Sequence, residues 1–211
     1  MALLLTGCAD TGGIEHGNSA VIGTNTAMKR LFKQDARHNP VQAARVEALA
    51  RAGAPAIIAQ IESRAAQGAL YQVQSRKGVS AYLSADGSLI TLDQGFLSAT
   101  RGLGGDLMSS EHARVIPMVL ARREGAVERT FRHLNGDDRL VAERFVCRVE
   151  NRGAREIPVP GGATAQTTFL AEICLSEGGE LRNLYWVGQD GQLVQSRQWA
   201  GDWLGMIAIL H

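Results

Sequence analysis

The stretch VSAYLSADGSLITL (residues 79–92) decides the fold class of this 211-residue chain. Apolar and polar side chains alternate on both sides of Asp86-Gly87, and this is the period of a β-strand with one buried face. An Asp-Gly pair between two such runs is a strong signal for a β-hairpin, because these residues accept the backbone angles of a tight turn. The stretch therefore predicts two antiparallel strands joined at Asp86-Gly87.

Similar short runs, separated by turns, extend over most of the chain. Strands at a spacing of about 8–12 residues without interleaved helices are typical of a barrel or sandwich. We therefore predict a mainly β domain, an antiparallel meander that forms a barrel-like or sandwich structure. The expected strands cover residues 56–62, 69–75, 79–84, 88–92, 95–99, 129–134, 139–150, 164–176, 184–187, 193–196 and 203–210, with 115–121 either helix or strand and a turn at 151–153.

One short helix is predicted near the N-terminus. Asn39 has the side chain of an N-cap and Pro40 suits the first helical position. Residues 41–50 are rich in helix formers, and Gly53 is placed to end the helix. The apolar residues expected to share the packed face are Val41, Ala44, Ala48 and Leu49.

The N-terminal sequence Leu5-Thr6-Gly7-Cys8 reads as a lipobox, after which a bacterial lipoprotein signal peptide is cut. We interpret residues 1–7 as a signal-peptide remnant, because the apolar run is short and no charged segment precedes it. Residues 8–19 would be the lipidated cysteine and a flexible, glycine-rich tether. Residues 20–211 would be a single β-rich domain. Acyl chains on Cys8 would anchor it to a membrane, and Ala9 after the cysteine favours the outer membrane, facing the periplasm.

Composition excludes some classes of function. The chain has 22 basic and 21 acidic residues, a net charge of +1, so no basic field would attract nucleic acid. Without Cys8, two cysteines remain, Cys147 and Cys174; in an oxidising compartment they could form a disulfide, or they could be two buried thiols. The five histidines show no ligand spacing with them, so we predict neither a metal site nor a cofactor.

No catalytic residues are predicted, since no Gly-x-Ser-x-Gly elbow is present and most of the acidic candidates lie in turns. The loop RGLGGD (residues 101–106) reads as a tight turn that needs positive φ angles, although its amides could contact a carbohydrate or anion. Aromatic, arginine and glutamine side chains could together contact a glycan or a partner; alternatively, the tryptophans are core residues of the β-domain. A buried Arg197 would need a partner such as Glu172 or Asp190. The candidate contact residues are Arg101, Tyr185, Trp186, Arg197, Gln198 and Trp199.

Several segments, in this order and spacing, resemble the YjbF/GfcB family of lipoproteins, which is linked to exopolysaccharide and group 4 capsule production in Gram-negative bacteria. The most specific are Arg101-Gly102-Leu103-Gly104 and Tyr185-Trp186 followed by Ser196-Arg197-Gln198-Trp199; the others are Asp86-Gly87 through Gly95, Phe145-Val146-Cys147 and Glu172-Ile173-Cys174. The resemblance runs from about residue 20 to the C-terminus. It implies a lipobox, a barrel-like β-domain and a role in polysaccharide secretion, and it implies no catalytic residues.

The leading hypothesis is therefore a non-enzymatic outer-membrane lipoprotein that assists exopolysaccharide or capsule export or assembly. Its partners would be the membrane, through the N-terminal lipid, and polysaccharide or proteins of the export machinery. A periplasmic carrier of lipids or lipoproteins is an alternative that predicts an open apolar cavity. A glycan-modifying enzyme is a further alternative that predicts two carboxylates about 5–9.5 Å apart in a cleft.

Overall fold

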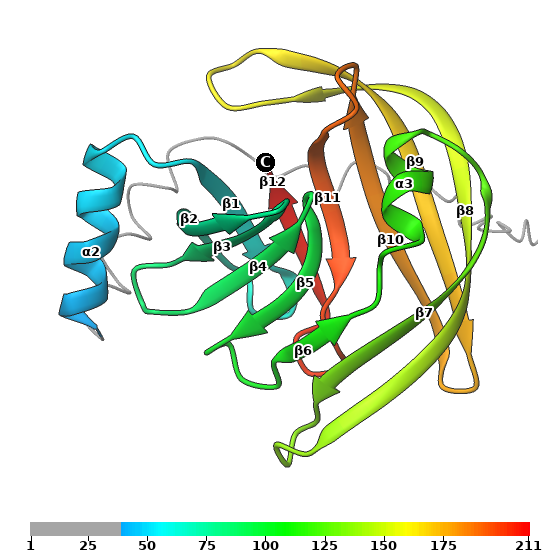
Figure 1. Cartoon of the computed structure of the whole chain (residues 1–211), viewed down its shortest axis with the longest axis horizontal. Helices are drawn as coiled ribbons and strands as arrows, with labels where there is room; N and C mark the ends of the chain where they lie inside the picture. The colour runs from blue at the N-terminus through cyan, green and yellow to red at the C-terminus, as the bar shows by residue number, and fades with distance from the viewer. Residues whose placement is uncertain (1–38) are drawn as a thin grey trace, which may run out of the picture.

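The computed structural model describes residues 39–211, which form a mainly β domain built from one antiparallel sheet. Figure 1 shows the strands following one another around the barrel, with helix α2 outside it. The lipobox and Cys8 lie outside the described residues. The helical elements are α2 (Pro40–Arg51), the 3₁₀ turn η1 (Glu62–Arg64) and α3 (Val115–Leu120). The strands are β1 (Ala56–Ile61), β2 (Ala66–Arg76), β3 (Val79–Leu83), β4 (Leu89–Asp93), β5 (Phe96–Arg101), β6 (Leu107–Ser110), β7 (Gly125–Leu134), β8 (Leu140–Pro158), β9 (Thr164–Ser176), β10 (Gly179–Gly188), β11 (Leu193–Trp199) and β12 (Met206–Leu210).

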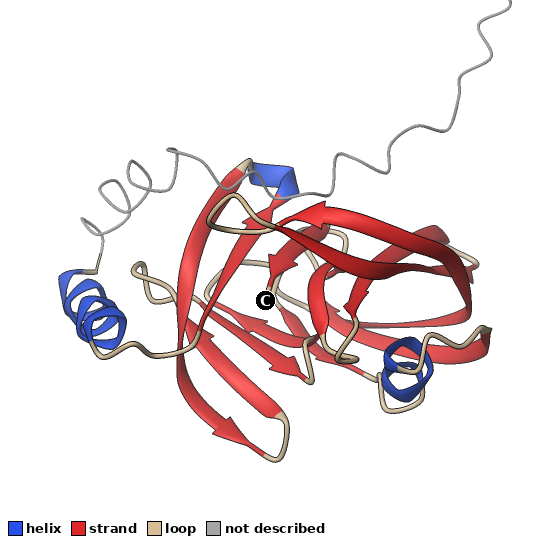
Figure 2. Ribbon diagram, turned by 90° about the horizontal axis from the view of Figure 1, so that it is seen from above, coloured by secondary structure: helices blue, strands red, loops and turns tan. Residues whose placement is uncertain are grey.

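The strand order makes this sheet a nearly closed barrel. Within residues 39–211 the order is β5-β4-β3-β2-β1-β12-β11-β10-β9-β8-β7-β6. The strands that come first and last in the sequence, β1 and β12, therefore pair with each other in the middle of this order. The two edge strands, β5 and β6, come side by side, and Figure 2 shows the strands curving round the interior. At this seam the amide of Leu107 donates to Thr100 Oγ1 over 3.0 Å, and Thr100 Oγ1 donates to Asp106 over 2.7 Å.

The predicted hairpin is present. Strands β3 and β4 are antiparallel, with Leu83 opposite Leu89. Gly87 has a φ of +95° and the Ser88 amide donates to Asp86 Oδ1 over 2.9 Å, as expected of an Asp-Gly turn. Positive φ angles at Gly102, Gly104 and Gly105 likewise make the 101–106 segment a tight loop.

Helix α2 also begins where predicted. Asn39 Oδ1 accepts a hydrogen bond from the Gln42 amide at 3.3 Å, and Pro40 is the first helical residue. The predicted packing face was wrong: Val41 is 74% exposed, while Val46 is the buried residue of the helix. The helix contacts the domain mainly through β2, and the contact is narrow. The way the helix is placed against β2, and not the apolar pattern of its sequence, therefore decides that Val46 is the residue that becomes buried.

Some further element boundaries differ from the sequence-based expectation, and one assignment that the sequence left open is decided. The expected turn at residues 151–153 is a bulge inside the long strand β8, where the register against β9 shifts between Asn151 and Ala154. Residues 115–121, which the sequence left open, contain helix α3. The last strand begins at Met206 instead of Trp203, because residues 200–205 form a loop.

The interior is filled by apolar side chains from all parts of the sheet and from α3. Phe131 packs edge-on against Trp199 and Phe145, with ring centroids 5.1 and 5.7 Å apart. Tyr185 lies 5.0 Å from Phe96 by the same measure. Aromatic rings each bury a large apolar area, so the contacts of Phe131 with Trp199 and of Tyr185 with Phe96, which join strands that are not neighbours in the sheet, stabilise the closed shape.

Candidate functional site

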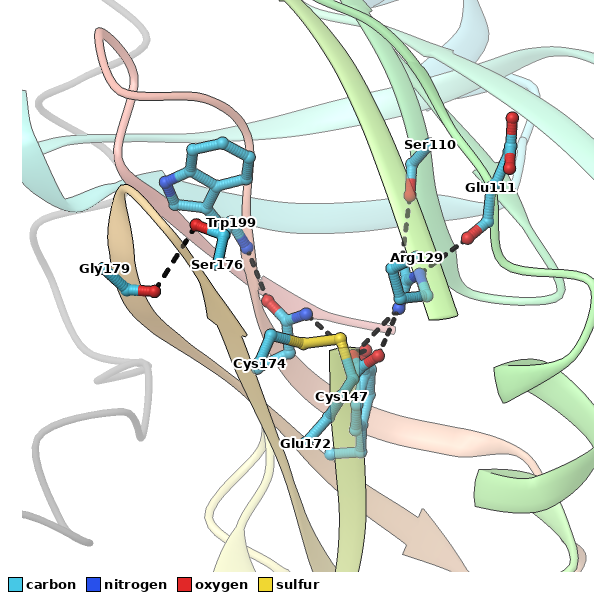
Figure 3. The surroundings of a disulfide bond; sticks show 11 residues. Ser110, Glu111, Arg129, Cys147, Glu172, Cys174, Ser176, Gly179 and Trp199 are labelled. Carbon is cyan, nitrogen blue, oxygen red and sulfur yellow. Dashed lines mark hydrogen bonds and ion pairs between the residues drawn. A yellow bond between two sulfur atoms is a disulfide. The ribbon is translucent and has the colours of Figure 1, made fainter. Parts of the chain in front are cut away.

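An ion pair lies inside the barrel, where a mainly apolar core is the expectation. Arg129 of β7 is 2% exposed and Glu172 of β9 is completely buried. Arg129 Nη1 donates to both carboxylate oxygens of Glu172, at 2.7 and 2.9 Å (Figure 3). Both residues occupy inward positions of the strand alternation, so the β-structure itself brings the two charges together.

Polar groups satisfy the remaining donors and acceptors of this pair. Arg129 Nε donates to the Glu111 carbonyl over 2.6 Å and Nη2 to Ser110 Oγ over 2.8 Å. Glu172 also accepts from Asn183 Nδ2 and from the Tyr185 hydroxyl, each over 2.7 Å. The network therefore ties β6, β7, β9 and β10 together, and full satisfaction is what makes a buried ion pair tolerable.

The electrostatics of the network favour ionised Arg129 and neutral Tyr185. Burial opposes the charge on Arg129, but the adjacent Glu172 carboxylate outweighs it, and the pKa of Arg129 is raised above its ordinary value. Burial, followed by the negative charge of Glu172, raises the pKa of Tyr185 well above its ordinary value. Tyr185 thus stays a hydrogen-bond donor at physiological pH, and a nucleophilic role for its phenolate is not supported.

A disulfide bond lies beside the ion pair. Cys147 of β8 and Cys174 of β9 are opposite each other in the sheet register, and their sulfurs are 2.05 Å apart (Figure 3). Both cysteines are buried in the core. A carboxylate oxygen of Glu172 lies close to these sulfurs. Because the two cysteines are joined in a disulfide, Cys147, Glu172 and Cys174 together offer no thiolate to a metal ion.

A broad groove runs along β7, β8 and β9 and the segment 110–114 that follows β6, and both outward-facing residues and inward-facing ones such as Arg129 line it. Its volume is about 950 Å³. The exposed pair Val146 and Leu175, directly opposite each other and 62% and 56% exposed, supplies apolar surface. Around them the groove is strongly polar, with both charge signs present. The charged lining residues are Asp93, Glu111, Arg114, Glu128, Arg129, Arg132, Arg144 and Glu177.

His112 borders this groove and is almost buried. Its Nε2 lies 3.2 Å from Asp93 Oδ2, while its Nδ1 has no hydrogen-bond partner among residues 39–211. Burial, helped by the charge of Arg129, lowers the pKa of His112 in spite of the hydrogen bond to Asp93. The Nδ1 atom without a partner is itself buried, so it offers no surface to a ligand in the groove.

The structure places the six candidate contact residues in two different environments. Tyr185, Trp186, Gln198 and Trp199 are buried, so they are core residues and present no surface to a glycan. Gln198 spans the interior: its Oε1 accepts from the Leu97 amide over 2.9 Å and its Nε2 donates to the Gly95 carbonyl over 3.2 Å. The alternative interpretation of the tryptophans as core therefore holds for Trp186 and Trp199.

The two arginines of that set keep some exposure, and their partners differ from those expected. Arg197 makes two hydrogen bonds of 2.6 Å to the carboxylate of Glu62, instead of pairing with Glu172 or Asp190. Arg101 donates to the Leu107 carbonyl over 3.2 Å across the β5–β6 seam. Both guanidinium groups thus connect parts of the barrel wall.

Sequence reasoning missed Arg129, the central residue of the buried network. A signal was present, because Arg129 stands between Val127 and Phe131 on the inward-facing side of an alternating strand. A charged residue at such a position needs a buried partner. Which acidic residue supplies it depends on the sheet, since Glu172 is 43 residues away.

Comparison with known proteins agrees with this fold. Residues 22–210 match the family described as group 4 capsule polysaccharide lipoprotein GfcB, YjbF. The chain belongs to the YjbF family. Its relatives in that family are lipoproteins, and lipoproteins are proteins of the cell envelope. Within residues 39–211, no helix combines the length and the apolar character that crossing a bilayer requires.

A solved structure resembles this YjbF-family chain. It is the hypothetical lipoprotein YmcC from Escherichia coli (K12), with a TM-score of 0.66 and 16% sequence identity. The similarity covers 74% of this chain and 84% of that one. At this identity the likeness establishes a shared fold. No curated protein sequence matches the chain.

Proposed function

We propose that this protein is a non-enzymatic lipoprotein of the outer membrane, facing the periplasm, that assists export or assembly of an exopolysaccharide or capsule. The observation that carries the proposal is the family match over residues 22–210. The family description names both a lipoprotein and a capsule polysaccharide. A barrel with a filled interior fits a binding or scaffolding role.

The anchor in this proposal is Cys8. Acyl chains there would hold the barrel at the membrane surface, and the tether of residues 9–19 would keep it close to membrane-bound export proteins. Tethering raises the effective concentration of one partner near another, even when their direct affinity is weak. The protein would then act mainly through its position and its surface.

We further propose that the groove over β7, β8 and β9 is the surface that contacts polysaccharide. Val146 and Leu175 offer an apolar patch for the C–H faces of sugar rings, and Arg132 and Arg144 beside them can donate to hydroxyl or carboxylate groups. The groove replaces the contact surface expected from the sequence, because four of its residues are buried: Tyr185, Trp186, Gln198 and Trp199.

The carrier alternative finds less support. The apolar pocket between β1, β2 and the β3–β4 loop has a volume of about 100 Å³. Ligand pockets usually measure about 300–1,000 Å³, so an acyl chain would not fit without movement of the walls. For an enzyme, the acidic residues of the groove alone are not enough: a reaction would also need a carboxylate with a suitably raised pKa.

The anchor is tested in the native host with the full-length gene. Cys8→Ser should release the protein from the membrane fraction and reduce secreted polysaccharide. Ala9→Asp is the matched variant, because it keeps the lipidated cysteine and is expected to retain the protein at the inner membrane. Unchanged membrane association and unchanged secretion in Cys8→Ser would refute the proposal.

The groove is tested by binding to the polysaccharide that the host secretes. Arg144→Glu with Val146→Ser should weaken binding by about tenfold or more, since charged hydrogen bonds and apolar contact are both lost. Arg76→Glu, an exposed charge reversal at the end of β2, should leave binding unchanged. An equal loss of binding in both variants would contradict the proposal, because it would show that binding depends on the overall charge of the protein. Unchanged binding in both variants would exclude the groove as the contact surface.

A further inference from the structure

One end of the barrel gathers three side chains that can bind metal ions, outside the groove and the buried ion pair. They are His133 of β7, Glu143 of β8 and Asp202 of the β11–β12 loop, and their potential ligand atoms all lie within 4.8 Å of one another. Loops of this end lie together at the bottom of Figure 1. We propose that these residues form a binding site for a divalent transition-metal ion, with Zn²⁺ as the best fit.

The contact between His133 and Glu143 needs a hydrogen or a metal ion between the two atoms. His133 Nε2 lies 2.7 Å from Glu143 Oε1. An imidazole lone pair and a carboxylate oxygen repel each other at this distance unless a proton or a metal ion lies between them. A proton satisfies the pair when the site is empty, and a metal ion can replace it, since metal binding to such ligands releases protons.

Charge favours the metal ion. Glu143 and Asp202 bring two negative charges to one imidazole, which carries at most one positive charge. Within residues 39–211, Glu143 forms its salt bridge with His133 alone, and Asp202 forms none. A divalent ion would neutralise both carboxylates, whereas a proton on His133 compensates only one of them.

The surrounding structure holds the ligands in place. Gly201 has a φ of +110°, and a Cβ atom there would lie 2.8 Å from His133, so the loop carrying Asp202 passes directly over the imidazole. The Trp199 ring packs edge-on against His133, with centroids 5.2 Å apart. His133 Nδ1 lies 3.5 Å from the Leu134 carbonyl. A backbone carbonyl near the second ring nitrogen is a common way to direct the other nitrogen toward a metal.

The ligand set suits zinc. One imidazole nitrogen and two carboxylate oxygens bind Zn²⁺ at about 2.0–2.2 Å, which places ligand atoms about 3.3–3.5 Å apart in a tetrahedral site. His133 and Glu143 would separate slightly, and Asp202, which is exposed on its loop, would move inward. Three protein ligands leave a fourth position for water or a ligand oxygen.

Calorimetric titration of the chelator-treated full chain with Zn²⁺ tests the proposal. The wild type should bind one ion at this site, and Mg²⁺ should not compete, because it prefers all-oxygen ligands. Asp202→Asn should weaken Zn²⁺ binding at least tenfold, and Glu143→Gln should do the same. Asp137→Asn, which changes an exposed aspartate in the nearby β7–β8 turn, should bind like the wild type.

Thermal unfolding supplies the second measurement. Zn²⁺ should raise the melting temperature of the wild type and of Asp137→Asn, because the ion would join β7 and β8 to the β11–β12 loop. The shift should be lost in Asp202→Asn, whose melting temperature without metal verifies that it folds. Equal Zn²⁺ affinity in the wild type and in Asp202→Asn would overturn the proposal and place the ion elsewhere, for example on His16 and His38. An absence of Zn²⁺ binding by the wild type would overturn it as well.

Discussion

Arg129 and Glu172 form a fully buried ion pair on the inner face of the sheet, between the two strands that flank β8, with two hydrogen bonds of 2.7 and 2.9 Å. Phe131 lies against the guanidinium, whose central carbon is 4.7 Å from the ring centroid. Charges are costly in such surroundings unless each has its partner. The pair therefore helps to fix the positions of β7 and β9 on either side of β8.

Glu172→Gln should destabilise the protein by about 3–5 kcal/mol, because it leaves the buried charge of Arg129 without compensation. Arg129→Met should cost a similar amount by leaving the carboxylate unpaired. The double variant should lose clearly less than the sum of the two, since no charge then remains. Urea unfolding of all four proteins measures this coupling, and simple additivity would show that the residues do not act as a pair.

The Cys147–Cys174 disulfide should contribute measurably to stability. It joins residues 27 apart in the sequence, and the chain-entropy estimate for a loop of this length is about 3–4 kcal/mol. Cys147→Ala with Cys174→Ala should therefore lower the urea midpoint under oxidising conditions. In reducing buffer the wild type should approach the variant. A variant as stable as the oxidised wild type would contradict this prediction.

His112 should make stability depend on pH. Burial lowers its pKa in the folded protein below the ordinary value of 6.5, so the unfolded chain binds the proton more readily. Stability is then unaffected by this group above about pH 6.5 and falls as the pH drops from there through the lowered folded-state pKa. His112→Gln should flatten the difference in unfolding free energy between about pH 7 and pH 5. Parallel pH profiles of wild type and variant would exclude His112 as the cause.

Gly105 should tolerate no side chain, because it combines a φ of +59° with a close neighbour. A Cβ atom there would lie 2.5 Å from the Cβ of Trp203. Gly105→Ala should cost about 1–3 kcal/mol from the backbone conformation and more from the clash. Gly153→Ala is the matched control, since Gly153 has a φ of +86° and open space around it. Both can be compared by thermal unfolding, and an equal loss would mean that the contact with Trp203 is unimportant.

The sequence predicted local features well. The Asp86-Gly87 hairpin, the helix start at Asn39-Pro40 and the glycine loop at residues 102–105 each depend on residues only a few positions apart. Turn conformation, capping and strand alternation are decided at this range. The pattern failed at two places. Residues 151–153 carry a turn signal but form a bulge inside β8, and residues 203–205, expected to begin the last strand, belong to a loop.

The candidate sites were much less accessible from the sequence. The cysteine pair could be named, but not whether its members meet. Arg129 and Glu172 come from strands separated by the whole of β8, and Asp202 comes from a different part of the chain than His133. Alternation along a strand shows that a side chain points inward without showing what it meets there.

By itself the sequence determined the β class, the main hairpins and turns, and the family resemblance, because backbone preferences and side-chain period act between near neighbours. The tertiary structure alone decided that β1 pairs with β12, that Trp186 and Trp199 are buried while Trp203 is exposed, and which charges are partners. Those features depend on strand register and barrel closure, which bring together residues far apart in the chain and set the burial of each side chain at once.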